Sequence, residues 1–315
     1  MSLDVIVPVY KPEEKKLERL IQQLNRQTRR PDHVFFLQTL VDEEEDQRVE
    51  TILDKAENAQ IFPIKKEDFD HGGTRNYGAG LSQADYLLFM TQDAVPVDEN
   101  LLASMESFYE QDPLLAVVYA RQLPSREVGP IERFTRLFNY PKESRIKGLK
   151  DLDTLGIKTY FCSNVCALYK KKTFDYMGGF VESTIFNEDM IYAAGAVKAG
   201  FKIGYQAQAK VIHAHKYTYR QQLSRNFDLA VSQKDYEELF ADVKSEKEGI
   251  KLVKLTIRYL NQTGRWYLIP DLILQSGFKY IGYWLGKHYR SLPKKMIKKI
   301  SMNPKYWDSE RRMDG

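Results

Sequence analysis

Apolar patterns typical of strands and helices alternate along most of the chain. Residues 3–9 form an apolar run typical of a buried parallel strand, and residues 12–27 place apolar side chains at helical spacing on one face. Further expected strands are 33–40, 59–64, 86–90, 115–122, 160–169 and 202–213, and further expected helices are 46–56, 74–83, 99–110, 187–199 and 217–240. This alternation predicts an α/β fold with a parallel, doubly wound sheet flanked by helices.

Two regions depart from the alternation. Residues 123–158 are charged and rich in proline and glycine, which predicts a loop-rich segment on the acceptor side of a binding crevice. Residues 250–315 indicate short helices separated by Gly264, Pro270 and Pro293. We therefore expect a catalytic domain at 1–240 and a helical, basic appendage at 241–315.

Composition limits the classes of protein. The 315 residues are 43% hydrophobic and 12% aromatic, which excludes a disordered chain. Two cysteines, Cys162 and Cys166, cannot build a disulfide scaffold or a four-thiolate zinc site and are expected in the core. The chain opens directly into a strand, and polar residues interrupt the apolar stretch 266–286. We expect a cytoplasmic protein without a membrane-spanning helix.

Charge is distributed unevenly along the chain. The net charge is +4, but residues 250–315 hold nine Lys and five Arg against three Asp and one Glu, so this region carries +10 and the rest −6. The basic segment 294–300 follows several aromatic residues, which predicts peripheral contact with an anionic membrane. A solvated basic helix face is the alternative, and the aromatic helices could instead pair two subunits. No nucleic-acid recognition motif accompanies the charge.

The segment Phe-Asp-His-Gly-Gly-Thr-Arg-Asn at 69–76 lies between an expected strand and an expected helix. Backbone N–H groups at a helix start, the helix dipole and an arginine guanidinium all favour phosphate. The segment therefore predicts an anion site that includes Arg75.

Three residues are candidate metal ligands. Asp93, in Thr-Gln-Asp-Ala at 91–94, follows an expected strand, and a carboxylate suits Mg²⁺ or Mn²⁺ bridging phosphate oxygens. The alternative is a turn or helix-cap aspartate. His213 and His215 end another strand and could complete the metal shell, although a partly buried histidine with a backbone partner is the alternative for at least one of them.

An acidic pair, Glu188-Asp189, begins an expected helix after a Gly-Gly-Phe turn. One carboxylate could be the general base that takes a proton from a hydroxyl group. The alternative is an acidic first turn stabilised by the helix dipole.

Four segments together resemble family 2 glycosyltransferases: 5–10 (Val-Ile-Val-Pro-Val-Tyr), 69–76, 91–94 and 187–189. The second and third are most similar to bacterial rhamnosyltransferases, and the length and basic tail resemble enzymes of streptococcal rhamnose-polysaccharide synthesis. The resemblance covers residue 1 to about residue 240. It implies the GT-A fold, a Rossmann-like mixed sheet flanked by helices.

The resemblance also implies roles for individual residues. Asp189 would be the base, with Glu188 beside it, and Ser163 and Asn164 would contact the acceptor. Asp93 would hold Mn²⁺ or Mg²⁺ with His213 or its rival His215. The residues implied to bind the donor nucleotide are Pro8, Val9, Tyr10, Gln38, Asp42, His71, Gly72, Gly73, Arg75, Gln92 and Asp93.

The sequence departs from the family pattern in two places. Gln38-Thr39 stands where the family usually has Asp-Ser, whose Asp reads the pyrimidine base, and Asp42 is the candidate to replace it. The segment 91–94 holds one carboxylate where the family's Asp-X-Asp has two, so the cation would be held loosely, mainly by Asp93 and the diphosphate, or would be dispensed with in part.

The activity implied is inverting transfer of L-rhamnose from dTDP-β-L-rhamnose to a lipid-linked cell-wall or capsular glycan at the inner face of the cell membrane. A UDP-hexose donor and a non-catalytic module that binds nucleotide sugars are the alternatives. A nucleotidyltransferase is a further rival, but such enzymes usually carry a Gly-rich loop where this chain has Pro8-Val-Tyr-Lys-Pro12.

Overall fold

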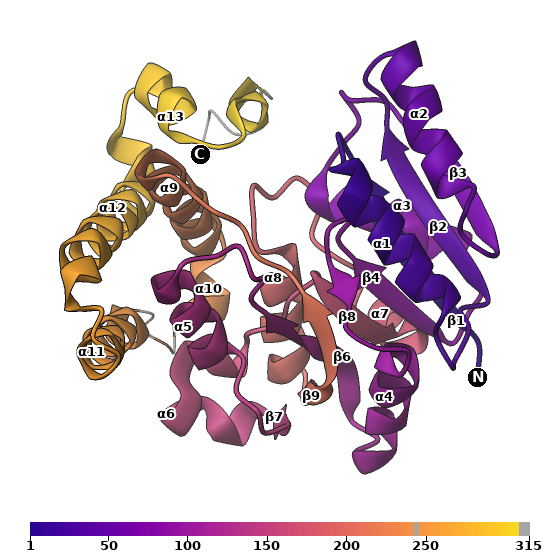
Figure 1. The fold of residues 1–315 in the computed structure, drawn as a ribbon, viewed down its shortest axis with the longest axis horizontal. Coiled ribbons are helices and arrows are strands. Elements are labelled where there is room, and N and C mark those ends of the chain that lie inside the picture. The colour runs from indigo at the N-terminus through magenta and orange to yellow at the C-terminus, as the bar shows by residue number, and fades with distance from the viewer. Residues whose placement is uncertain (242, 244–245, 309–315) are drawn as a thin grey trace. The chain divides into compact units, whose positions relative to one another are not determined.

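The computed structural model describes residues 1–241, 243 and 246–308 (Figure 1). Its contacts divide the chain into two compact units. The N-terminal unit comprises 1–126, 139–182 and 188–214, and the C-terminal unit comprises 127–138, 183–187 and 215–315. The segments 127–138 and 215–240 thus group with the C-terminal helices, whereas the sequence predicted a boundary at 240.

The N-terminal unit is built on a nine-stranded mixed sheet, as the family resemblance implied. The strands are β1 (Leu3–Val9), β2 (His33–Thr39), β3 (Ala59–Ile64), β4 (Tyr86–Met90), β5 (Val95–Pro96), β6 (Leu115–Leu123), β7 (Arg145–Lys147), β8 (Cys166–Lys170) and β9 (Lys202–Ile212). Their order is β3-β2-β1-β4-β8-β6-β9-β5, and β7 pairs with β9. The first four strands of this order are parallel, but β8 runs antiparallel to both neighbours, so the expectation of a wholly parallel sheet was wrong.

Helices cover both faces of this sheet. On one face α1 (Glu14–Asn25), α2 (Glu43–Leu53) and α4 (Leu101–Ser107) bury their apolar sides in one cluster that includes Val5 and Val7 of β1. Ile6 points to the other face, as strand alternation requires, and meets α3 (His71–Leu81) at Gly78. Helices α7 (Lys171–Tyr176) and α8 (Glu188–Lys198) complete that face through a cluster of rings: Phe89, Tyr169, Phe174, Phe180 and Tyr192.

The strand directions bring distant segments to one edge of the sheet. Strands β1, β4, β6 and β9 all end at this edge, and β8 begins there because it runs the opposite way. The loops after Val9, Met90, Leu123 and Ile212 therefore meet the segment before Cys166. Ligands of open α/β sheets bind at such an edge.

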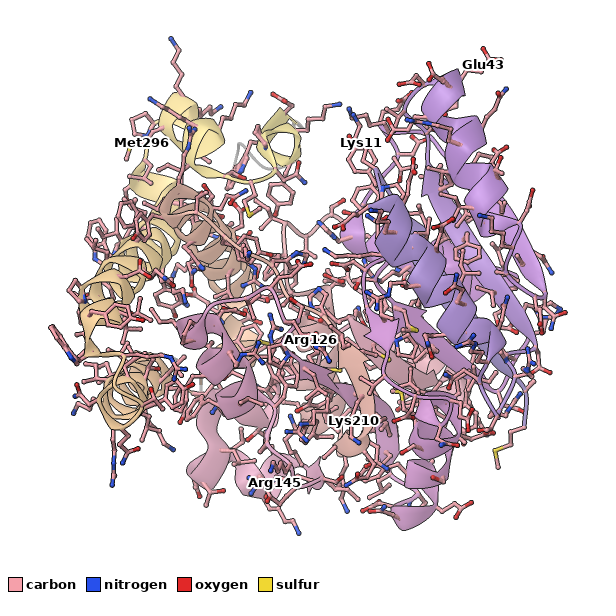
Figure 2. The ribbon with its side chains drawn as sticks, in the orientation of Figure 1. Lys11, Glu43, Arg126, Arg145, Lys210 and Met296 are labelled. Carbon is pink, nitrogen blue, oxygen red and sulfur yellow. The ribbon has the colours of Figure 1, made fainter. Side chains whose placement is uncertain are left out.

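The C-terminal unit is helical. Its helices are α5 (Pro130–Asn139), α9 (Tyr219–Asp235), α10 (Glu237–Phe240), α11 (Glu246–Gln262), α12 (Ile269–Lys287) and α13 (Lys294–Ile300). α12 packs closely along α9, since a Cβ at Gly282 would lie 2.1 Å from the carbonyl oxygen of Leu223. Figure 2 shows the side chains of the unit, including Met296 of α13, which is exposed.

Several expected elements need correction. Residues 123–158 are not mainly loop, because α5, β7 and the short helices η2 (Leu149–Asp151), α6 (Leu152–Leu155) and η3 (Gly156–Thr159) form there. The strand expected at 160–169 begins only at Cys166. α3 begins at His71, three residues before the expected start, because Asp70 caps it: its Oδ1 accepts from the Gly73 N–H at 2.6 Å.

The C-terminal helices are longer than expected. α11 has 17 residues and α12 has 19. Pro270 does not separate helices but lies in the first turn of α12, where its missing N–H costs no hydrogen bond. Within the described part of the chain, no helix is both long and apolar enough to cross a membrane. The remaining short helices are η1 (Phe108–Gln111), η4 (Trp266–Leu268), η5 (Tyr289–Ser291) and η6 (Pro304–Asp308).

Candidate active site

A reciprocal pair of hydrogen bonds joins the loops after β1 and β4. Gln92 Oε1 accepts from the Tyr10 N–H at 2.7 Å, and Gln92 Nε2 donates to the Tyr10 carbonyl at 2.8 Å. The side-chain amide of Gln92 is thus engaged with backbone. It fixes the loop of Tyr10 beside Asp93, the next residue.

Asp93 lies beside His213, the residue after β9. Asp93 Oδ2 and His213 Nε2 are 3.6 Å apart, beyond hydrogen-bond distance, and His213 is 8% exposed. His213 Nδ1 lies 3.2 Å from Gln122 Oε1, an arrangement that orients Nε2 toward Asp93. One ligand atom each of Asp93, His213 and His215, which is two residues further along the chain, lies within 4.8 Å of the others.

This donor set fits a divalent cation. A carboxylate oxygen suits Mg²⁺ and Mn²⁺, and imidazole nitrogens favour Mn²⁺ over Mg²⁺. Because the protein supplies only a few ligands, coordination positions remain for a diphosphate.

The acidic pair at the start of α8 is held by the segment before β8. Asp189 Oδ2 accepts from the Asn164 N–H at 2.9 Å, and Asp189 Oδ1 accepts from the Met190 N–H at 2.7 Å. Glu188 Oε1 accepts from Asn164 Nδ2 at 3.2 Å and lies 3.3 Å from Arg75 Nη1. One residue, Asn164, therefore positions both carboxylates.

The pKa values of the two carboxyl groups are shifted in opposite directions. Burial, together with the charge of Glu188, raises the pKa of Asp189 to about 7. Burial also acts to raise the pKa of Glu188, but Arg75 and His71 have the larger combined effect and hold this pKa below its ordinary value. Such divergence is typical of a carboxylate pair with separate catalytic tasks, and a pKa near 7, like that of Asp189, suits a general base.

The 69–76 segment makes other contacts than the phosphate contacts expected of it. Arg75 is 6% exposed and pairs with Glu188, and its Nη1 also donates to the His71 carbonyl at 2.8 Å. Gly73 N–H is engaged by the capping Asp70. A Cβ at Gly72 would lie 1.9 Å from the carbonyl oxygen of Val181, so this position requires glycine for close packing. Donor contacts from this segment stay a prediction.

The remaining expected ligands differ in exposure. Gln38 is 2% exposed and donates to the Asp46 carbonyl, so in this structure it is a core residue. Asp42 caps α2 by accepting from the Glu45 N–H at 2.9 Å, the turn function that any such aspartate can serve. Their contact with a nucleotide base stays a prediction, as do the roles of Pro8 and Val9 at the end of β1.

Two residues that support the site were missed from the sequence. Gln122, at the end of β6, bonds His213 and also donates to Ser163 Oγ at 2.9 Å. Tyr169 donates to Asn164 Oδ1 at 2.8 Å. Asn164, which was expected to contact the acceptor, is 3% exposed, and its side chain forms hydrogen bonds with Glu188 and Tyr169. A glutamine at a strand end is the one signal that could have indicated Gln122.

The fold and the site define a nucleotide-sugar-dependent glycosyltransferase, and comparison with protein families agrees. Residues 4–178 match glycosyl transferase family 2, so the chain belongs to that family and is a glycosyltransferase. It is 35% identical over 311 residues to the O-antigen chain rhamnosyltransferase RfbN of Salmonella typhimurium, covering 98% of this chain and 97% of RfbN. It is 36% identical over 310 residues to the O-antigen chain rhamnosyltransferase WbaN of Salmonella anatum, covering 98% and 96%.

Solved structures confirm the GT-A fold. TarS 1-349 of S. aureus has a TM-score of 0.53 at 17% identity, covering 92% of this chain and 91% of that one. The mannosyltransferase PcManGT of Pyrobaculum calidifontis, solved with GDP-Man and Mn²⁺, has a TM-score of 0.57 at 12% identity, covering 97% and 84%. At these identities the likeness concerns the fold alone.

Proposed function

We propose that this chain transfers L-rhamnose from dTDP-β-L-rhamnose to a hydroxyl group of a glycan, with inversion at C1. The observation that carries the reaction is Asp189, a carboxylate fixed by two backbone N–H groups and with its pKa raised to about 7. The near full-length similarity to two O-antigen chain rhamnosyltransferases supports rhamnose as the sugar.

In the proposed step, Asp189 takes the proton of an acceptor hydroxyl group. The hydroxyl oxygen bonds to C1 of rhamnose on the face opposite the nucleotide, the C1–O bond breaks, and its electron pair leaves with dTDP. The product is an α-L-rhamnoside. Glu188 stays ionised beside Arg75, so it does not compete for the proton. A base of this kind contributes about 10²–10⁴-fold.

A divalent cation at Asp93 and His213, with His215 as the third candidate ligand, would stabilise the negative charge that develops on the leaving diphosphate. The protein's own part is to hold these side chains in place. Gln122 orients His213, and Gln92 ties the Asp93 loop to the end of β1.

We further propose that the acceptor is a lipid-linked cell-wall or capsular glycan and that 250–315 contacts the inner membrane face. Support comes from one face of α12. Its apolar side chains recur at helical spacing, a pattern typical of a buried face, but they are about half exposed. They are Ile273, Leu274, Tyr280, Ile281 and Trp284, and Trp266 and Tyr267 precede them. Trp and Tyr favour the membrane interface, and the lysines of α13 would each add about 1 kcal/mol at an anionic surface.

The test is release of dTDP or UDP by the purified protein from dTDP-rhamnose, UDP-glucose and UDP-GlcNAc, each with and without Mn²⁺. Turnover of dTDP-rhamnose alone supports the proposal. Turnover of a UDP-sugar alone would replace the donor, and binding of dTDP-rhamnose without turnover, even with glycan acceptors added, would favour a binding module.

A further inference from the structure

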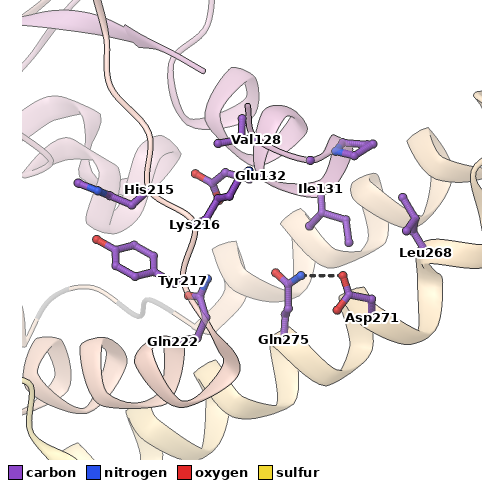
Figure 3. A pocket seen from close by; sticks show the side chains of 12 residues that line it. Val128, Ile131, Glu132, His215, Lys216, Tyr217, Gln222, Leu268, Asp271 and Gln275 are labelled. Carbon is purple, nitrogen blue, oxygen red and sulfur yellow. Dashed lines mark hydrogen bonds between the residues drawn. The ribbon is translucent and has the colours of Figure 1, made fainter. Parts of the chain in front are cut away.

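The C-terminal unit contains a cavity of about 210 Å³ (Figure 3). Its walls come from the start of α5, the segment 215–217, Gln222 of α9, and Asp271 and Gln275 of α12. The reaction proposed above uses none of these α5, α9 and α12 residues. A cavity of this size holds one sugar ring rather than an extended chain.

Its walls are rigid on the apolar side. Ile131 packs with Leu260 and Leu272 in one cluster, and Leu268 joins that cluster from the edge of the cavity. Phe134 of α5 also stacks on Tyr259 of α11, with ring centroids 4.7 Å apart. The start of α5 is therefore anchored to α11 and α12, so the cavity is a fixed feature of this unit.

Carboxylates form part of the polar side. Asp271 accepts from Gln275 Nε2 at 2.9 Å, drawn as a dashed line in Figure 3, and also from the Tyr219 hydroxyl group. Glu132 accepts from Arg136 Nη2 at 3.0 Å. Each carboxylate can accept further hydrogen bonds, so both can receive sugar hydroxyl groups.

Gln222 is the buried polar side chain among the residues that line the cavity. It is 8% exposed, lines the cavity, and its side-chain amide makes no hydrogen bond within the residues that the structure describes. A ligand hydroxyl group, which both donates and accepts, would satisfy both ends of this amide.

We infer that the cavity binds one neutral sugar residue of the acceptor glycan. The inference rests on the proposed function. Val128, Ile131 and the ring of Tyr217 offer apolar surface for the C–H face of a sugar, while Gln222 and the carboxylates face its hydroxyl groups. Asp271, which has no cationic partner among the described residues, disfavours a phosphate or an acidic sugar, while Glu132 is paired with Arg136 and Lys216 is exposed. His215, two residues after His213 along the chain, lines the same cavity.

The experiment measures binding of the methyl glycosides of rhamnose, mannose, galactose and glucose to the full chain by ligand-observed NMR. Gln222→Met keeps the length of the side chain but removes the amide, and Tyr217→Phe removes one hydroxyl group. Gln262→Met, at an exposed glutamine of α11, is the matched control. Thermal unfolding of every variant checks that the fold is retained.

We expect at least one methyl glycoside to bind to the wild type. Gln222→Met should weaken this binding about tenfold, which corresponds to the loss of one good hydrogen bond, and Gln262→Met should leave the binding unchanged. Equal binding by the wild type and a folded Gln222→Met, or no binding of any methyl glycoside, would overturn the inference. Competition by inorganic phosphate would assign the cavity to an anion instead. Donor turnover by the wild type is measured separately, so failure of the transferase proposal is distinguishable from failure of this one.

Discussion

Replacing Asp189 by asparagine should inactivate the enzyme and, at alkaline pH, stabilise it. The pKa of Asp189 is raised from 3.8 to about 7, mainly by burial. The folded state therefore holds this proton more tightly than the unfolded state does. The associated stability is present below pH 3.8 and is lost as pH rises through about 7, so at pH 8 the wild type carries the full penalty of a buried charge, at most about 4 kcal/mol.

Asparagine removes that charge but also an acceptor. Both carboxylate oxygens accept backbone hydrogen bonds, from Asn164 and Met190, and an amide nitrogen can accept neither. Losing one of these bonds costs about 1–3 kcal/mol. Asp189→Asn should therefore be about 1–3 kcal/mol more stable than the wild type at pH 8. Near pH 4 the two proteins should be about equally stable, because Asp189 is then protonated and, like asparagine, offers one carbonyl oxygen.

The assay is urea unfolding of both proteins at the two pH values, with turnover measured on the same samples. Asp228→Asn is the matched control, since burial also raises the pKa of Asp228 to about 7 and this residue of α9 lies outside the active site. It should show the same pH trend in stability with turnover intact, whereas Asp189→Asn should lose about 10²–10⁴-fold. Identical stability effects at both pH values, or turnover within tenfold of wild type, would refute the reasoning.

Further predictions follow from other parts of the structure. Because the base must be ionised, kcat/KM should rise about tenfold per pH unit below pH 7 and level off above it; a flat profile between pH 5 and 8 would exclude Asp189. Asp93→Asn should raise the Mn²⁺ concentration needed for half-maximal turnover, and an unchanged Mn²⁺ titration would remove Asp93 from the metal site. The double variant Ile281→Ser, Trp284→Ser should sediment less with anionic vesicles but keep its activity on a short soluble acceptor. Equal vesicle binding by the variant and the wild type would show that the α12 face does not contact the membrane. Gly72→Ala should destabilise the fold by about 1–3 kcal/mol, since its Cβ would collide with a backbone carbonyl group, and unchanged unfolding would show that the neighbouring loop yields.

Periodicity predicted most of the N-terminal unit because its strands are apolar runs and its helices carry one apolar face. It failed where tertiary contacts decide. Charge and proline in 123–158 suggested loop, but α5 is stabilised by burying Ile131 in the cluster with Leu260, more than a hundred residues away. The antiparallel direction of β8 depends on its partners β4 and β6, which no local pattern encodes. The family resemblance implied a mixed sheet where periodicity implied a parallel one.

The site illustrates the same division. The sequence predicted roles for Asp93, His213 and Asp189 from residue type and position, since carboxylates and histidines at strand and helix ends are the usual carriers of metal and proton chemistry, and these roles stay predictions. It could not show that 69–76 and Glu188-Asp189 are one structural unit. Asn76 holds the loop at Phe180 through two hydrogen bonds, of 2.8 and 2.9 Å, and Arg75 neutralises Glu188. In the proposed mechanism, the segment that looks like a phosphate loop thus keeps Glu188 ionised, so the acceptor proton goes to Asp189.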